Sequence, residues 1–299
     1  MTSWVSQRSF GKPSMSKKRT LLMDGDTLAF RAASAVQHTI EHPSGYIEPF
    51  ARRPEGEAVL DNMISRLKGQ LGGTDILMFL SCPSEENWRY QVADTYKSNR
   101  VGSFRPYLLE PLKQYLRLKY DAFHLAFLEA DDALGIYCTA PDLVEGDKIV
   151  VGCDKDFKTI PGKHYQLGDN EEGKPVIRTY NALEAAEAHY VQALSGDAVD
   201  GYAGCPGVGK TRAEKIVANP VKLYKKSGTI TRGKNKGMAT VKWHEGDPCS
   251  IWEAVVANYE KAGLTEGHAL TTARLAKILL HGDYDMETHE VRLWVPGDE

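Results

Sequence analysis

Short apolar runs alternate with segments of helical periodicity over the first two thirds of the chain. The runs at 20–23, 75–80, 123–127 and 148–151 read as strands, and the segments at 27–36, 57–71, 105–119 and 128–140 place apolar residues on one helical face. Strands that alternate with helices are typical of an α/β fold with a mainly parallel central sheet flanked by helices. We expect this core at residues 20–195, after a flexible N-terminal tail at 1–19.

The remaining pattern is less regular. Residues 164–180 predict a hairpin and 182–194 a helix, the closing segments 251–259 and 269–280 predict helices, and 291–295 predicts a last strand. Residues 40–55 are rich in Pro and Gly and predict a loop. The basic, Gly-rich segment 221–243 predicts a solvated or disordered loop that is compatible with electrostatic contact to a DNA duplex.

Composition narrows the class of protein. The 299 residues are 42% hydrophobic and 26% charged, as in an ordinary globular protein, and the net charge of −3 argues against a uniformly basic coat for nucleic acid. The five cysteines are widely spaced without a Cys-x-x-Cys pair, which excludes a disulfide framework or zinc knuckle and favours a reducing compartment. No apolar run approaches the roughly 18 residues that span a bilayer. We expect a cytoplasmic protein, monomeric and without a membrane partner.

Carboxylates gather where the predicted elements end or begin. They are Asp24, then Glu129, Asp131 and Asp132, then Asp154 and Asp156, and finally Asp197 and Asp200. Each group alone is explained by a helix cap or a polar turn. Together they would concentrate negative charge at one edge of the sheet, which is unfavourable without cations. Oxygen ligands select hard metals, so Mg²⁺ or Mn²⁺ is expected.

Cationic and aromatic residues form a second candidate group. Tyr96, Lys97 and Arg100 fall within five residues, and Arg31 and Arg89 flank other predicted strand ends. An aromatic face can stack on a base, and cations can hold phosphates. A solvated polar loop explains the same residues equally well when they are taken alone.

The segment 204–211 matches the phosphate-loop pattern G-x-x-x-x-G-K-[ST]. A nucleotide-binding loop of that kind follows a buried strand, but residues 197–203 are polar. The segment also fits the turn of a helix-hairpin-helix, in which Gly204, Gly207, Gly209 and Lys210 grip a DNA backbone without reading its sequence. The pattern favours the helix-hairpin-helix first, a turn with a purely structural role second, and the nucleotide-binding phosphate loop last.

In combination and order, these motifs resemble the flap-endonuclease superfamily of 5′ nucleases, and within it the 5′→3′ exonucleases of short-tailed bacteriophages. The similarity rests on 23–26 with Arg31, 87–89 with 96–100, 129–132, 152–158 and 196–210, and it spans about 21–294. It implies a PIN-like core, a helical arch at about 82–120 and a helix-hairpin-helix region at 196–299. One departure is Ser81-Cys82, where the family usually has an Asp and where Glu85 or Glu86 could substitute.

The resemblance implies a two-metal 5′→3′ exonuclease that acts on duplex DNA ends, 5′ flaps and the RNA primers of RNA–DNA hybrids during phage replication. The first metal ion would be held by four residues, Asp24, Glu129, Asp131 and Asp132. Asp154 and Asp156 would bridge from it toward the second metal ion. Asp197 and Asp200 would complete the site of the second ion. Lys97 and Arg100 would contact the scissile phosphate, Tyr96 would stack on the terminal nucleotide, and a monovalent cation would bind at the hairpin.

Two other classes remain open from the sequence. A non-catalytic protein that binds DNA junctions would share the fold but have lost turnover with the missing Asp. An ATP-driven phosphate-loop protein would bind nucleotide through Lys210.

Overall fold

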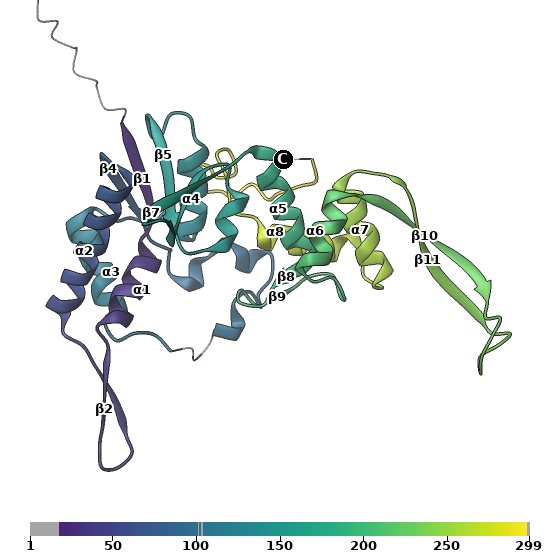
Figure 1. Cartoon of the computed structure of the whole chain (residues 1–299), viewed down its shortest axis with the longest axis horizontal. Helices are drawn as coiled ribbons and strands as arrows, with labels where there is room; N and C mark the ends of the chain where they lie inside the picture. Colours follow the sequence, from purple (N-terminus) through teal and green to yellow (C-terminus); the bar gives the residue numbers. More distant parts are fainter. Residues whose placement is uncertain (1–17, 101, 103, 298–299) are drawn as a thin grey trace, which may run out of the picture.

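The computed structural model describes residues 18–297 apart from 101 and 103 (Figure 1). Nearly all of the predicted N-terminal tail, residues 1–17, lies outside the described residues. None of the helices in the described part of the chain combines the length and apolar character needed to cross a bilayer. All five cysteines are free thiols, as their spacing predicts.

The centre of the molecule is a five-stranded sheet in the order β4-β1-β5-β6-β7. Strands β4, β1, β5 and β6 run parallel, and only β7 is antiparallel to its neighbour β6. The bounds are β1 Arg19–Asp24, β4 Asp75–Phe79, β5 Asp147–Gly152, β6 Gly162–Glu171 and β7 Lys174–Tyr180. The predicted α/β fold with a mainly parallel sheet is confirmed.

Helices cover both faces of this sheet. Leu21 and Met23 of β1 pack on one face with Ile149 and Val151 of β5, under three helices: α1 Gly25–Ala35, α2 Arg53–Leu71 and α3 Leu109–Tyr120. The intervening residues Leu22 and Val150 point to the other face, where α4 Ala130–Thr139 covers them. Because both faces are buried, the strands read as continuous apolar runs in the sequence.

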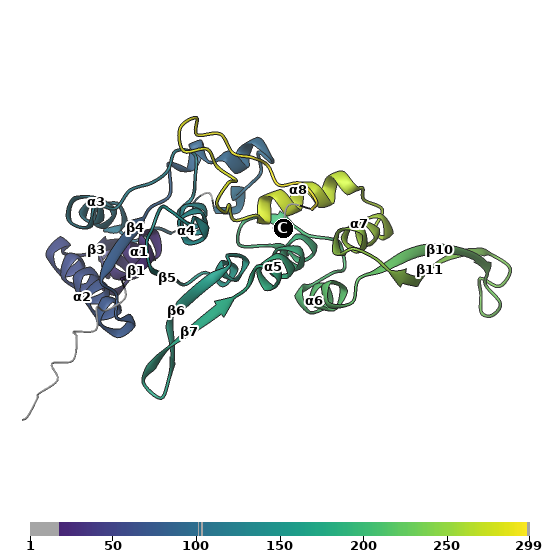
Figure 2. The same ribbon diagram turned by 90° about the horizontal axis from the view of Figure 1, so that it is seen from above.

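The C-terminal helices form a second apolar cluster beside the sheet. They are α5 Ala182–Ser195, α6 Lys210–Ala218, α7 Ile251–Lys261 and α8 Glu266–Ala276. Between α5 and α6 the chain makes a minimal hairpin of β8 Gly196–Asp197 and β9 Tyr202–Ala203. The segment therefore has the helix-hairpin-helix arrangement, and Figure 2 shows it beside the sheet rather than on it.

The predictions for exposed segments were less accurate. Residues 40–55, predicted as a loop, contain most of the hairpin β2 His38–Glu41 and β3 Ile47–Phe50. The predicted loop at 221–243 is part of a long hairpin of β10 Val221–Thr229 and β11 Ala239–Pro248. Conversely, the strands predicted at 123–127 and 291–295 are reduced to the single bridges Phe79–Phe123 and Tyr284–Val291.

The segment predicted as a helical arch, about 82–120, is not built of α-helices in its first part. Its described residues before α3 contain three short 3₁₀ turns, at Ser84–Glu86, Trp88–Gln91 and Ser98–Arg100. Helix α3 packs Leu112 and Leu116 into the core under the sheet. The turns bring residues 96–100 beside β8 and β9, because Lys97 N–H donates to the carbonyl of Asp200 over 2.9 Å.

Candidate active site

Three carboxylates arrive at the carboxyl edge of the sheet from adjacent elements. Asp24 ends β1, Asp154 follows β5, and Asp131 lies in the first turn of α4. Asp24 also caps α1, since its Oδ1 accepts a hydrogen bond from Thr27 N–H over 3.0 Å. A Cβ on Gly152 would lie 2.3 Å from the Phe157 ring and 3.3 Å from the Cβ of Asp24, so glycine at this position lets both side chains pack against the end of β5. Neighbouring parallel strands thus deliver the acids to one place.

Burial and mutual repulsion raise the pKa values of Asp24 and Asp131. Burial, followed by the charges of Asp26 and Asp154, raises the pKa of Asp24 to about 6, against the hydrogen bonds from Thr27. Burial raises the pKa of Asp131 well above its ordinary value, and the charges of Asp24 and Asp154 add to the effect. Carboxylates held this way favour either a proton or a cation between them. Their oxygen donors suit a hard divalent ion such as Mg²⁺.

The acid side chains have not closed around a common point. Within residues 18–297, as far as they are described, no three His, Cys, Asp or Glu side chains have the spacing of a metal site. Several of the acids are instead paired with lysine or arginine. The donor chemistry therefore fits a hard cation, while Glu129, Asp132, Asp197 and Asp200 are neutralised by lysine or arginine.

Glu129 is one of the paired acids. Its carboxylate binds Lys97 Nζ closely, accepts from Arg89 Nη1 over 3.1 Å and accepts from the Tyr96 hydroxyl over 2.9 Å. Burial opposes its charge, but Lys97 and Arg89 outweigh burial and lower the pKa of Glu129 to about 2. The group stays ionised at any working pH.

Asp132 is placed differently from the expected metal ligand. Its carboxylate is fully buried and accepts from both Nη1 and Nη2 of Arg89, over 2.7 and 2.9 Å, from Trp88 Nε1 over 3.0 Å and from Leu279 N–H over 3.1 Å. These four hydrogen bonds use the oxygens that a metal would need. The structure therefore contradicts a role for Asp132 in metal binding and gives it a structural one.

Arg89 and Tyr96 are also corrected by the structure. Arg89 is 3% exposed and Tyr96 is 2% exposed, so neither side chain can reach DNA in this conformation. Arg89 additionally donates to the carbonyls of Leu275 and Lys277, which joins the segment after β4 to the end of α8. The Tyr96 hydroxyl bonds to Glu129 and Asp200 instead of facing a nucleotide.

A second set of acids lies at the end of the helix-hairpin-helix. Lys155 Nζ bonds Asp197 Oδ2 over 2.7 Å and approaches Asp156 Oδ2 at 3.5 Å. Burial, followed by the charge of Asp154, raises the pKa of Asp156 to about 6, although Lys155 opposes this. Asp200 pairs with Arg100 Nη2 over 2.5 Å. The charge of Asp154 acts on both Asp24 and Asp156, and the charge of Asp197 acts on Asp156, so Asp154 and Asp156 connect the acids of the sheet with those of the hairpin.

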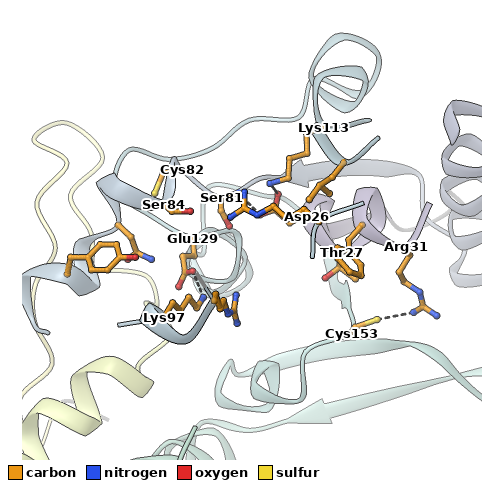
Figure 3. Close-up of a pocket in the computed structure, with 16 residues that line it drawn as sticks. Asp26, Thr27, Arg31, Ser81, Cys82, Ser84, Lys97, Lys113, Glu129 and Cys153 are labelled. Carbon is orange, nitrogen blue, oxygen red and sulfur yellow. Dashed lines mark hydrogen bonds and ion pairs between the residues drawn. The ribbon is translucent and has the colours of Figure 1, made fainter. Parts of the chain in front are cut away.

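A cavity of about 850 Å³ is lined by the carboxylates Asp26 and Glu129 and by residues adjacent to the first set of acids (Figure 3). Its lining includes Thr27, Glu129 and Cys153, which are bonded to or close in sequence to Asp24, Asp131 and Asp154. Five cations also line it: Arg31, Lys97, Arg100, Arg105 and Lys113. Arg31 Nη1 donates to Cys153 Sγ over 2.9 Å. Carboxylates of this kind suit divalent metal ions, and the surrounding lysine and arginine side chains suit the phosphodiester on which such ions act.

Comparison with known proteins assigns the family. No family model matches the chain. The exonuclease of Escherichia phage T7 is 30% identical over 93% of this chain and 94% of its own length, and the exodeoxyribonuclease of Enterobacteria phage T3 is 30% identical over 93% of each. The chain belongs to the 5′ nuclease superfamily. It is a nuclease, as the resemblance predicts.

Relatives and solved structures outside these phages are more distant. A 5′-3′ exonuclease of Streptomyces coelicolor is 26% identical over 66% of this nuclease and 71% of its own length. The bacteriophage T5 flap endonuclease aligns with 67% of this chain and 75% of its own at 16% identity, with a TM-score of 0.48. That structural similarity is too low to place individual residues.

Next to the candidate active site, the nuclease has the turn between α5 and α6 that the sequence predicts as a helix-hairpin-helix. A Cβ on Gly204 would lie 2.3 Å from Gly196 N, and Gly207 has a φ of +75°, so both positions favour glycine. Gly209 is the N-cap of α6 and makes no side-chain hydrogen bond to it, and Lys210 is the first residue of the helix. The preceding β9 is a two-residue hairpin strand outside the main sheet, so the context of a nucleotide-binding loop is absent. The N-terminal end of α6 has the amide donors and the dipole direction that suit a backbone phosphate.

Sequence reasoning missed several residues of the nuclease site. Asp26 accepts from Ser81 N–H over 2.9 Å, at the position where the family usually has an Asp, and pairs with Lys113 over 2.8 Å. Glu85 and Glu86, the expected substitutes, are exposed and outside the cavity lining. Burial and the charge of Lys210 lower the pKa of Lys158, which places a second lysine near the hairpin turn. The sequence signals were the Asp24-x-Asp26 pair and Lys158 just after the Asp154 motif.

Proposed function

We propose that the protein is a divalent-metal-dependent 5′→3′ exonuclease that acts on duplex DNA ends and 5′ flaps. The observation that carries this proposal is the meeting of Asp24, Asp131 and Asp154 beside a cavity lined by Arg31, Lys97 and Arg100. An exonuclease activity is named for the phage T7 and T3 relatives. RNA–DNA hybrids with primer RNA fit the same backbone-directed site, and we place the enzyme as a monomer in the cytoplasm of an infected cell.

We assign Asp24, Asp131 and Asp154, with Glu129, to one divalent ion, and Asp156, Asp197 and Asp200 to another. When bound by these carboxylates, Mg²⁺ or Mn²⁺ would activate the attacking water and stabilise charge on the leaving oxygen. Lys97 and Arg100 hold the phosphate, since they are the cations that already lie between the two acid sets. Their release from Glu129 and Asp200 would free both charges for the substrate.

The glycine turn and Lys210 hold the duplex by its backbone, with a monovalent cation as a further ligand of that turn. Backbone contacts of this kind orient the substrate without reading its sequence. We accordingly divide the chain into a catalytic core at 20–195, which includes an arch at 82–120, and a DNA-binding region at 196–299. Arg31 would contact phosphate from α1, on the opposite side of the cavity from Lys97.

The decisive experiment measures nucleotide release from a 5′-labelled duplex with Mg²⁺, with Mn²⁺ and with EDTA. Wild type should release nucleotides only with a divalent metal, and Asp154→Asn should reduce the rate by about 100-fold or more. The matched control is Asp142→Asn, which removes an exposed carboxylate from the loop after α4 and should leave the rate unchanged. Tight binding of DNA without any metal-dependent release would instead favour the non-catalytic junction binder.

A further inference from the structure

The hairpin β10–β11 projects away from the rest of the molecule in both views (Figures 1 and 2). It leaves the body after α6 and returns to it before α7. Between 221 and 248 none of its residues is buried, and Tyr224, Met238 and Val241 are more than half exposed. A two-stranded hairpin in water is only marginally stable by itself. An extended element with no core of its own contributes little to the stability of the fold. We therefore look for the role of this hairpin in a partner that binds to its surface.

The charge of this hairpin is opposite to that of the rest of the protein. Seven basic and two acidic side chains give residues 221–248 a net charge of +5, whereas the whole chain carries −3. The tip between the strands holds three of the basic residues, Arg232, Lys234 and Lys236, all exposed. The remainder of the chain is therefore distinctly acidic, and the positive charge is concentrated on one projecting element.

The two faces of the hairpin are arranged differently. Direct cross-strand partners share a face, and successive pairs alternate between faces. On one face Lys225 lies over the ring of Trp243, with its Nζ 5.0 Å from the ring centroid. On the other face Lys226 is paired directly with Lys242, next to the stacked rings of Tyr224 and His244.

The Lys226–Lys242 pair is unfavourable without an anion. Like charges directly opposite each other destabilise a hairpin. Among the described residues no carboxylate lies within ion-pair distance of either lysine, while Lys222 nearer the base approaches Glu253 at 3.9 Å. Two facing cations beside exposed aromatic rings form a surface that suits a polyanion.

We propose that this face and tip of the β10–β11 hairpin bind the phosphate backbone of duplex DNA beyond the helix-hairpin-helix turn. The proposal rests on the proposed function, since it extends the same duplex. The nine residues of β10 span about 30 Å, close to one turn of B-DNA, which is about 34 Å. The hairpin lengthens the grip on the substrate by roughly one turn and strengthens it without sequence preference.

The test compares two DNA stem-loops that have the same open end and stems of about 10 and about 30 base pairs. Binding of the full-length protein is measured by fluorescence anisotropy in EDTA over a series of salt concentrations. The variant Lys226→Ala/Lys242→Ala should weaken binding to the long stem about tenfold and lower the slope of log Kd against log salt by about 2. Binding to the short stem should be unchanged.

The matched control is Arg66→Ala/Lys68→Ala, which removes two exposed charges from α2 at the opposite end of the molecule. It should leave the long-stem affinity and slope at their wild-type values. The variant Lys226→Arg/Lys242→Arg should also keep wild-type affinity. Because the alanine pair removes repulsion, its Tm should be equal to or higher than that of wild type.

Unchanged affinity and slope on the long stem would overturn the proposal, and so would an equal loss on both stems or a lower Tm of the alanine pair. The metal-dependent release of nucleotides from the short stem is measured separately, and the alanine pair should match wild type. If wild type itself releases none, the proposed nuclease function fails while the binding comparison still decides the role of the hairpin.

Discussion

At the scale of residues, Asp131 and Asp132 are neighbours in the chain with different surroundings. Asp131 is half-buried next to Asp24 and Asp154, where its charge is repelled. Asp132 is buried in a bidentate pair with Arg89. A carboxylate that repels its neighbours is a candidate for holding a cation, and one that satisfies a buried guanidinium holds the fold together.

These two aspartates should respond to mutation in opposite ways. Asp132→Ala removes the bidentate partner of the buried Arg89 guanidinium and leaves it with Glu129 as a carboxylate partner, so it should lower the free energy of unfolding by about 3–5 kcal/mol. Asp131→Asn removes repulsion and should leave that free energy unchanged or higher, while nuclease activity falls by about 100-fold or more. Urea unfolding and nucleotide release on the same preparations check both expectations. Equal losses of stability in the two variants would contradict the assignment.

Asp24 predicts a pH dependence of stability when divalent metal is absent. Its pKa is raised from 3.8 to about 6, so the folded state holds the proton more tightly than the unfolded state. This contribution to stability is fully present below pH about 4 and is lost as pH rises to about 6. At pH 7 the ionised group should cost about 2–3 kcal/mol.

The measurement compares wild type with Asp24→Asn in EDTA, by urea unfolding at pH 4 and pH 7. Asparagine retains the helix cap on α1, so the comparison isolates the charge. The variant should gain stability relative to wild type between the two pH values. A constant difference across this range would show that the Asp24 carboxylate is not repelled in the folded state.

At the scale of elements, the buried strands and the hairpin β6–β7 could be predicted, whereas the exposed hairpins β2–β3 and β10–β11 could not. Residues 20–23 and 148–151 are apolar on both faces because helices cover both sides of the sheet. The hairpin strands β10 and β11 are solvated on both faces, so they lack the alternation that identifies a strand. The ion pair of Arg89 with Asp132 joins positions 43 residues apart, and no local pattern reports it.

The N-terminus of α6 is the element expected to hold the duplex near the active site. Lys210→Ala should weaken duplex binding several-fold and lower the salt slope by about 1, with no change in rate at saturating DNA. Lys215→Ala, which removes an exposed lysine from the last turn of the same helix, is the control and should leave both quantities unchanged. Calorimetry with ATP should show no binding, and nucleotide binding that depends on Lys210 would support the phosphate-loop hypothesis instead.

At the scale of the whole molecule, residues 96–100 link the sheet to the helix-hairpin-helix. Asn99 Nδ2 donates to the carbonyl of Ala198 over 2.8 Å, and Arg100 pairs with Asp200. The acid motifs and their order were visible in the sequence, but this link was not. It depends on tertiary hydrogen bonds between a segment of 3₁₀ turns and the β8–β9 turn about 100 residues later.

Loosening this link should have a local and measurable effect. Asn99→Ala removes two hydrogen bonds to the β8–β9 turn, and amides at 96–100 should exchange with solvent faster, by an amount equivalent to about 1 kcal/mol. The control Asn62→Ala removes an exposed amide from α2 and should leave their exchange rates unchanged. Identical rates in both variants would mean that other contacts fix the segment.

The pairing of Glu129, Asp197 and Asp200 with Lys97, Lys155 and Arg100 has a consequence for how the protein matures. Since the chain supplies its own counter-ions, these acids can be brought together before any metal arrives. Under the proposed metal-dependent function, a newly synthesised molecule would reach its native shape in a metal-poor environment and be activated afterwards. Assembly and activation would then be separate events, and the supply of divalent ions would control only the second.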